Sequence, residues 1–285
     1  MLTSSAIDAV VRAALLEDAP WGDVTSEALI PADATAHARL TAREPGVLSG
    51  GEVFAATMTA ADPGIRTEFR VADGERFDAG DVIATVTGPA RGVLRGERVA
   101  LNLVQRMSGI ATLTARYVAE VAHTTARIVD TRKTTPGLRA LERHAVRCGG
   151  GHNHRFSLSD AVMAKDNHLA ILTAQGLSVT EALLKARAGL SHTTHVEVEV
   201  DGIEQIEPVL AAGIDTIMLD NFTLEQLREG VAIVDGRALV EASGNVTVET
   251  VRDIAETGVD IISSGALTHS VRSLDLGLDI DVSTA

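Results

Sequence analysis

Two lysines stand at positions where they could bind an anion. The 285 residues contain only three lysines, Lys133, Lys165 and Lys185. Lys133 follows the β-branched run of residues 127–131, and Lys165 ends a second such run at residues 161–165. Runs of this kind predict β-strands. Because substrates of βα proteins bind at the ends of the strands, both lysines are expected to contact a substrate.

The segment between these two runs adds further cations. Residues 149–155 read Gly-Gly-Gly-His-Asn-His-Arg, a flexible stretch that can bring an imidazole and a guanidinium to the same edge. Arginine binds carboxylate or phosphate bidentately and keeps its charge when desolvated. Arg132 and Arg155, together with Lys133 and Lys165, would neutralise several negative charges on one ligand.

Three histidines in the same region, His144, His152 and His154, could form a metal site. The neighbouring cations would oppose a divalent ion, so we do not expect one there. Cys148 is the only cysteine, which excludes an intramolecular disulfide and a site with several cysteine ligands. We interpret it as a small residue of a helix.

Carboxylate residues lie at or near the ends of two further expected strands. Glu199 lies near the end of residues 195–200, and Asp220 ends residues 216–220. Oxygen ligands of this kind could share Mg²⁺ with a pyrophosphate, and pairing with the nearby Lys and Arg is the alternative. Glu197 should lie on the same strand face as Glu199 but deeper, where it could equally pair with Lys165.

Small residues follow the last two expected strands. Ser243 and Gly244 come after one, and Ser264 and Gly265 after the other. Turns of small residues that feed helices expose backbone N–H groups, and barrels often bind phosphate after their final strands. A phosphate is therefore expected here, with His269 either supplementing the site or capping a helix.

These residues are spaced by a repeating strand and helix pattern. Strands are predicted at residues 127–131, 161–165, 195–200, 216–220, 238–242 and 260–264, with helices at residues 204–212, 224–234 and 248–257 between some of them. Strands and helices in this alternation predict a parallel βα barrel, open or closed. Their carboxyl ends would then present the polar residues at one rim.

The first hundred residues predict an α+β domain instead. A helix is expected at residues 5–17 and strands at residues 36–43, 67–71 and 81–87. A long helix follows at residues 96–123, and a break in it would fall at Ser108 and Gly109. The tail, residues 274–282, alternates like a strand and could return to this first domain.

Composition excludes several classes of function. The net charge of −14 and the aromatic content of 2% argue against nucleic-acid binding, because a polyanion would be repelled and few rings could stack on bases. The N-terminal pattern lacks the apolar run of a signal peptide or membrane span. A cytoplasmic protein without nucleic-acid or membrane partners is expected.

Several segments form a set that identifies a family. They are Gly22-Asp23-Val24-Thr25, Glu97-Arg98, Ser108-Gly109-Ile110-Ala111-Thr112, Asp130-Thr131-Arg132-Lys133-Thr134, Pro136-Gly137-Leu138-Arg139, Asn153-His154-Arg155, Lys165-Asp166-Asn167-His168 and Leu219-Asp220-Asn221. With them the sequence resembles, over nearly its whole length, the quinolinate phosphoribosyltransferases, which are type II phosphoribosyltransferases. One departure is Arg143-His144, where the family commonly has Lys-Tyr, and it puts any role of that lysine in doubt.

The resemblance implies an α/β fold with an N-terminal α/β sandwich domain, residues 1–108 joined by the tail 272–285, and an open-faced α/β barrel, residues 109–271. It implies a homodimer with shared active sites and transfer of phosphoribosyl from phosphoribosyl pyrophosphate to quinolinate with decarboxylation, in the biosynthesis of NAD. Mg²⁺ is the implied cofactor.

The resemblance also assigns residues to the substrates. Arg132, Arg155 and Lys165 would bind the quinolinate carboxylates, with His154 nearby and Arg98 supplied by the partner subunit. Lys133, Glu199 and Asp220 match positions that serve phosphoribosyl pyrophosphate and its Mg²⁺, and Lys165, Glu199 and Asp220 are the expected catalytic residues. The remaining substrate-binding positions are Thr131, Ser243, Gly244, Ser264, Gly265 and His269.

The residues suggest three other functions, of which the third is set aside. The first is a paralogous phosphoribosyltransferase of the same fold, linked to molybdenum transport or acting on another pyridine acid. The second is a Schiff-base aldolase that uses Lys165 or Lys133. The third is a lipoyl or biotinyl carrier, because residues 71–88 are similar to half of one, but no lysine for attachment occurs before Lys133.

Overall fold

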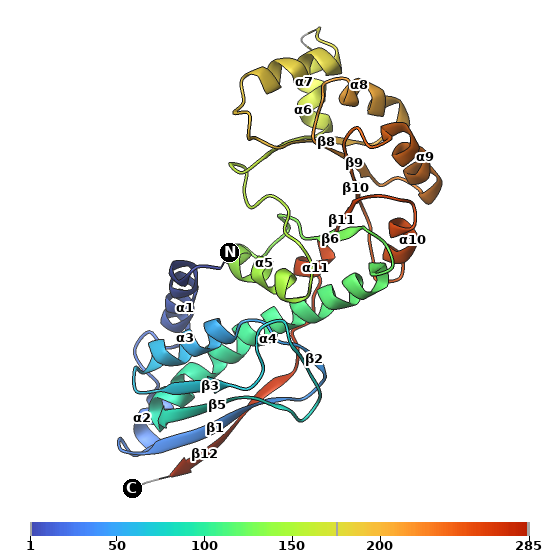
Figure 1. Cartoon of the computed structure of the whole chain (residues 1–285). Helices are drawn as coiled ribbons and strands as arrows, with labels where there is room; N and C mark the ends of the chain where they lie inside the picture. The colour runs from blue at the N-terminus through green and yellow to red at the C-terminus, as the bar shows by residue number, and fades with distance from the viewer. Residues whose placement is uncertain (1, 175, 284–285) are drawn as a thin grey trace. The chain divides into compact units, whose positions relative to one another are not determined.

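The computed structural model describes residues 2–174 and 176–283 (Figure 1). The chain forms two compact units. Unit 1 comprises Met1–Ala115, Thr134–Gly150 and Leu267–Ala285, and unit 2 comprises Arg116–Lys133 and Gly151–Ala266. The domain boundary after residue 108 stays a prediction, and the two units are described separately below.

Unit 1 is built on a four-stranded antiparallel sheet with the order β12-β1-β5-β3. The strands are β1 (Thr35–Ala42), β3 (Arg66–Phe69), β5 (Val82–Pro89) and β12 (Leu276–Ser283). In β1 the buried Ala36, Ala38 and Leu40 alternate with exposed residues, as expected of a strand with one face in the core. The tail strand β12 pairs with β1, and Ala38 lies opposite Ile280.

Helices cover the apolar face of this sheet. Phe54 and Met58 of α3 (Gly51–Ala61) and Val104 of α4 (Ala90–Val121) belong to the same buried cluster as β1 and β5. The other elements of unit 1 are α1 (Ser4–Asp18), α2 (Val24–Leu29), the β2 (Gly46–Val47) and β4 (Arg76–Phe77) pair, and α5 (Arg139–Cys148). The unit therefore has its own core.

Helix α4 is continuous, so the expected break at Ser108 and Gly109 is wrong. The hydroxyl of Ser108 is buried and hydrogen bonds to the backbone N–H and C=O of Ser49, at 3.2 Å each. A Cβ on Gly109 would lie 2.2 Å from the carbonyl oxygen of Arg272. The glycine therefore allows the C-terminal segment to pass close to the helix, which is a packing requirement and not a helix-ending signal.

Unit 2 contains six parallel strands in the order β6-β11-β10-β9-β8-β7. They are β6 (Arg127–Val129), β7 (Val162–Ala164), β8 (Val196–Val200), β9 (Thr216–Asp220), β10 (Leu239–Ser243) and β11 (Ile261–Ser263). The strand order places β6 and β7 at the two edges, so the barrel is open. The predicted α/β fold class is confirmed.

The helices of unit 2 connect these strands. They are α6 (Asp166–Thr173), α7 (Val179–Ala188), the 3₁₀ turn η1 (Ile203–Gln205), α8 (Ile206–Leu210), α9 (Leu224–Val234) and α10 (Val251–Ala255). The helix expected at residues 248–257 is shorter in the structure, where α10 begins only at Val251, and α11 (Ala266–His269), after the last strand, has four residues. Among the described helices, none is long and apolar enough to cross a membrane.

Candidate active site

The interior of unit 2 is lined by every second residue of its strands. Because strand side chains alternate between faces, Val198 and Leu219 are buried on the helix side, and their neighbours point into the barrel. The inward residues surround a cavity of about 440 Å³. Its lining consists of Thr131, Arg132, Lys133, His154, Arg155, Met163, Lys165, Glu199, Met218, Asp220, Glu241, Ser243 and Ser263.

The floor of this cavity is a buried acid and imidazole cluster. His154 Nε2 lies 3.0 Å from Glu197 Oε2 and 3.6 Å from Glu241 Oε2. The ring nitrogen on the other side, His154 Nδ1, accepts a hydrogen bond of 2.7 Å from the backbone N–H of Arg155. Because Nδ1 accepts, a proton on the neutral ring resides on Nε2, where it faces the two carboxylates.

Asp130 holds the segment that carries the imidazole. This carboxylate is fully buried and accepts hydrogen bonds from the His154 backbone N–H, at 2.8 Å, and from Asn153 Nδ2, at 2.5 Å. The glycine run before Asn153 gives the backbone freedom, and Asp130 fixes its end. The imidazole is thereby positioned by the strand β6 that precedes it.

Burial and charge shift the ionisation of the floor. Burial, followed by the charge of Glu197, raises the pKa of Glu241 to about 7. Burial alone would lower the pKa of His154, but the hydrogen bond to Glu197 and the charges of Glu241, Glu197 and Asp130 outweigh it and raise this pKa. The cluster therefore retains protons near neutrality.

The rim above the floor is cationic. Lys165 Nζ forms an ion pair with Glu199 Oε2, and Arg155 Nη1 donates to the carbonyl oxygen of Ala161 at 2.9 Å. Both guanidinium groups line the cavity, and burial and the charge of Arg132 lower the pKa of Arg155. Arg132 Nε is buried, with no hydrogen-bond partner among the described residues. A buried, charged donor without a partner favours the binding of an anionic ligand.

The far side of the rim is shaped by two interlocked turns. Asn221 Nδ2 donates to Asp220 Oδ2 at 2.7 Å, and Asn245 Nδ2 lies 3.3 Å from Asn221 Oδ1. Gly244 has a φ of +103°, and a Cβ there would lie 2.2 Å from Asn221 Oδ1. Only glycine fits at this position, so the loops after β9 and β10 meet at the cavity edge beside Asp220.

Most of the predicted site residues are brought together in this cavity. Five do not line it, and three of these, Gly244, Ser264 and Gly265, lie within two residues of the lining residues Ser243 and Ser263. Ser264 donates instead to the carbonyl oxygen of Val246 at 3.3 Å.

Two other predicted residues, Arg98 and His269, lie in unit 1. Arg98 is exposed on α4, and His269 Nδ1 lies 2.6 Å from the hydroxyl of Ser270. Neither lines the cavity of unit 2.

The sequence left four lining residues without an assigned role, namely Met163, Met218, Glu241 and Ser263. The available signal was the two-residue period of the strands, since Glu241 precedes Ser243 by two and Met218 precedes Asp220 by two.

The three histidines considered as a metal site fall in different units, with His144 in unit 1 and His152 and His154 in unit 2. His154 faces Glu197 and Glu241, as described, and His144 has different partners, Asp73 and Cys148. At the cavity rim, Glu199 and Asp220 offer carboxylate oxygens of the kind that Mg²⁺ prefers.

Comparison with known proteins identifies the family of this chain. The model of the quinolinate phosphoribosyl transferase N-terminal domain matches residues 23–108, and that of the C-terminal domain matches residues 110–279. A relative from Mycobacterium leprae named nicotinate-nucleotide pyrophosphorylase (carboxylating) is 45% identical, over 98% of this chain and 100% of the relative. A Bacillus subtilis relative named probable nicotinate-nucleotide pyrophosphorylase (carboxylating) is 42% identical, over 94% of this chain and 91% of the relative.

Solved structures agree with this match. The crystal structure of NadC from Streptococcus pyogenes superimposes with a TM-score of 0.94 and 42% sequence identity, and the match covers 100% of this chain and 99% of that chain. The nicotinate-nucleotide pyrophosphorylase from Francisella tularensis gives a TM-score of 0.91 at 34% identity, over 99% of this chain and 98% of that chain. The C-terminal domain model covers all the residues that line the cavity, and this chain is a member of the quinolinate phosphoribosyl transferase family.

Proposed function

We propose that the protein transfers the phosphoribosyl group of phosphoribosyl pyrophosphate to quinolinate and releases carbon dioxide, giving nicotinate mononucleotide and pyrophosphate for the biosynthesis of NAD. The observation that carries this function is the cavity of unit 2, where Arg132, Arg155 and Lys165 meet in a chain of this family. The relatives named quinolinate phosphoribosyltransferase (decarboxylating), such as one from Nicotiana tabacum that is 43% identical, support the direction of the reaction.

The rim suits a dicarboxylate. Quinolinate carries two adjacent carboxylates, and the buried, unpartnered Arg132 Nε supports a guanidinium role in binding one of them. Arg155, with His154 beside it, is proposed to bind the other. Lys165 is held by Glu199 and is proposed to exchange this ion pair for a substrate carboxylate.

The reaction needs positioning and electrostatic stabilisation more than covalent chemistry from the protein. The bond between C1 of the ribose and the pyrophosphate oxygen breaks with its electron pair on pyrophosphate, and the quinolinate ring nitrogen forms the new bond to C1. The ring is then cationic, so the carbon–carbon bond to the adjacent carboxylate can break with its electron pair left beside the positive nitrogen. Carbon dioxide leaves, and the ring carbon takes a proton. The raised pKa of His154 supports this residue as a nearby proton donor.

Mg²⁺ is the proposed cofactor, because Glu199 and Asp220 supply oxygen ligands at the rim and Mg²⁺ is commonly held by one or two carboxylates together with substrate phosphates. When bound, the ion would neutralise charge on the pyrophosphate. Lys133 is proposed to act on the same phosphates, and Ser243 and the turn at Gly244 are proposed to face the phosphate of the ribose.

We also propose a homodimer in which Arg98 of one copy completes the site of the other. The exposed position of Arg98 on α4 is compatible with this role. Mixing inactive Arg98→Ala protein with inactive Lys165→Ala protein tests it, because a mixed dimer contains one site with neither defect. About a quarter of the sites should recover activity after exchange of subunits, and no recovery would exclude a shared site.

Incubation with quinolinate, phosphoribosyl pyrophosphate and Mg²⁺ tests the function directly. We expect nicotinate mononucleotide and carbon dioxide in equal amounts. Lys165→Ala should lower turnover by at least about a hundredfold, whereas Lys185→Ala, an exposed lysine of α7, should leave it unchanged. Equal turnover of nicotinate, or of another pyridine acid in preference to quinolinate, would instead favour a paralogous phosphoribosyltransferase. Borohydride trapping of Lys165 or Lys133 with a carbonyl substrate would favour an aldolase.

A further inference from the structure

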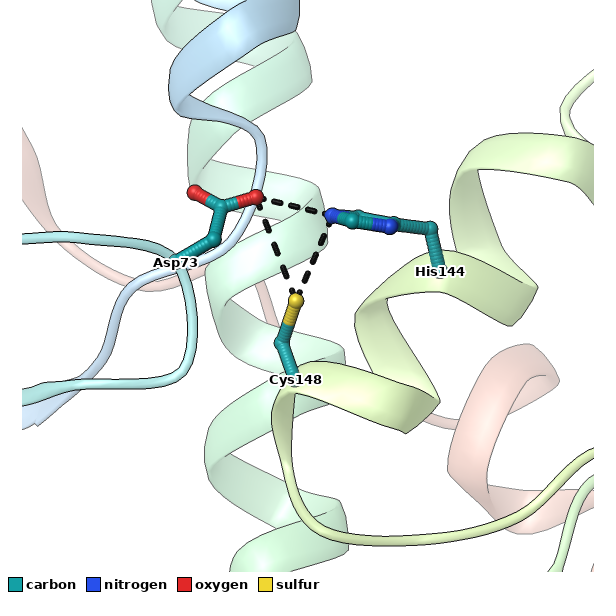
Figure 2. Close-up of side chains that lie close together, drawn as sticks. All are labelled: Asp73, His144 and Cys148. Carbon is teal, nitrogen blue, oxygen red and sulfur yellow. Dashed lines mark hydrogen bonds and ion pairs between the residues drawn. The ribbon is translucent and has the colours of Figure 1, made fainter. Parts of the chain in front are cut away.

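A second group of metal-ligating side chains lies in unit 1, and none of its members lines the cavity of unit 2. Asp73 follows β3, and His144 and Cys148 lie one turn apart on α5, so that both face the same way. Figure 2 shows the carboxylate, the imidazole and the thiol turned toward one another. His144 Nε2 lies 2.8 Å from Asp73 Oδ2 and 3.3 Å from Cys148 Sγ, and the thiol lies 3.9 Å from the carboxylate.

These three distances approach those of a tetrahedral zinc site. Bonds of about 2.3 Å to sulfur and about 2.0–2.1 Å to nitrogen or oxygen place the ligand atoms of tetrahedral zinc roughly 3.3–3.6 Å apart. Each distance in the cluster differs from this range by about 0.5 Å or less. Small rotations of the side chains can make up this difference. The ligand types also fit, because thiolate and imidazole suit Zn²⁺ and are poor ligands for Mg²⁺ or Ca²⁺.

The ligands are fixed by the surrounding backbone. Asp73 Oδ1 accepts a hydrogen bond from Gly51 N–H at 2.9 Å, and Oδ2 accepts one from Gly50 N–H at 3.0 Å, at the start of α3. A Cβ on Gly149 would lie 2.4 Å from the carbonyl oxygen of Ala111, so the end of α5 that carries the thiol is packed tightly on α4. Ligands that are oriented before binding lose little entropy when the ion arrives.

The cluster is also open to an entering ion. The side chains of His144 and Asp73 are 30% and 24% exposed. A cation that enters would find its three ligand atoms already within 3.9 Å of one another.

We propose that Asp73, His144 and Cys148 bind one thiophilic divalent cation, with Zn²⁺ as the best-fitting ion. Three protein ligands leave the fourth tetrahedral position to water. Because Asp73 and His144 are 71 residues apart in sequence, the ion would cross-link the turn after β3 to α5. The site rests on unit 1 alone and does not depend on the proposed reaction.

Cobalt substitution gives the most direct test, because Cys148 is the only cysteine of the chain. The full-length protein, with excess Mg²⁺ present to occupy oxygen sites, would be titrated with Co²⁺. A sulfur-to-cobalt charge-transfer band that saturates at one ion per chain is expected and must come from Cys148. Absence of the band in the wild-type protein would overturn the proposal without reference to any variant.

Modification of the thiol tests the complete ligand set. Zn²⁺ should slow alkylation of Cys148 by iodoacetamide by roughly tenfold or more, since a bound thiolate is a poor nucleophile. His144→Ala and Asp73→Asn should abolish this protection, and His37→Ala, which removes an exposed histidine of β1, should retain it. Protection that survives in both ligand variants would show that Zn²⁺ binds Cys148 through other groups and would also overturn the site.

Discussion

The cavity of unit 2 and the Asp73, His144 and Cys148 cluster of unit 1 both gather ionisable side chains, but they differ in what is left without a partner. In the cavity, Arg132 Nε and one carboxylate oxygen each of Glu197 and Glu241 are buried without a hydrogen bond among the described residues. In the cluster, both oxygens of Asp73 accept hydrogen bonds from backbone amides. Buried polar atoms without partners are costly, so the cavity favours an occupied state, whereas the polar atoms of the cluster have partners even before an ion binds.

The two regions should also respond to pH in different ways. The raised pKa of Glu241, about 7 against an ordinary 4.5, means that its contribution to stability is complete below about pH 4.5 and is lost as the pH rises through about 7. In the cluster, burial opposes but does not prevent a lowered pKa of Asp73, whose hydrogen bond to His144 favours the charged form. Its contribution is complete above the usual pKa of 3.8 and is lost in acid.

The largest effect is expected from Arg132, whose buried Nε has no hydrogen-bond partner among the described residues. Arg132→Ala should lower kcat/KM for quinolinate by about a thousandfold, because a substrate carboxylate would lose a charged, buried donor. Arg228→Ala removes an exposed arginine of α9 and should leave kcat/KM unchanged. Steady-state kinetics would measure both. Unchanged kinetics in Arg132→Ala would show that the cavity does not need this donor for its substrate, and the contrast with the hydrogen-bonded cluster would then fail.

The next effect concerns the acidic floor. Glu241→Gln replaces the buried carboxyl by a neutral group of the same shape. At pH 8 the variant should be more stable than the wild type by up to roughly 3 kcal/mol, and at pH 5 the two should be nearly equal. Urea unfolding of the full chain at both pH values measures this, with the exposed Glu229→Gln as control. A variant that is less stable at pH 8 would show that the ionised Glu241 is favourable in the fold.

Two glycines with similar backbone angles allow a direct comparison of the two regions, Gly244 at the cavity rim and Gly74 beside Asp73. Their φ values are +103° and +91°. A Cβ added to Gly244 would lie 2.2 Å from Asn221 Oδ1, whereas a Cβ added to Gly74 would have no atom closer than 3.5 Å. Alanine at either position costs about 1 kcal/mol of backbone strain. Gly244→Ala should cost about 2–3 kcal/mol because of the added clash, and thermal unfolding compares them. Equal losses would contradict the close fit of the loops at the cavity rim.

The smallest effect is expected in the metal-free cluster. His144→Ala should lower the free energy of unfolding by about 1 kcal/mol at neutral pH, since the ion pair with Asp73 is partly exposed. The difference should disappear in acid, once Asp73 is protonated. Urea unfolding in the presence of a chelator measures it. A loss that persists unchanged in acid would mean that packing of the ring, and not its charge, supports the cluster.

The sequence alone predicted the parts of the site that follow from local pattern. The six parallel strands of unit 2 lie within two residues of their predicted bounds, because β-branched runs and polar ends are local signals. Parallel strands bring their carboxyl ends to one rim, so the strand pattern was sufficient to place Lys165, Glu199 and Asp220 together.

The tertiary structure decided what depends on contacts between distant segments. It showed that Gly109 allows Arg272 to pass close to α4 and does not break the helix. It also showed that Glu241 is buried beside Glu197 and has a raised pKa. It also joined His144 to Asp73, 71 residues away. The physical reason is that periodicity and strand ends are fixed by neighbours along the chain, whereas burial, pKa shifts and convergent ligands arise only when remote segments pack together.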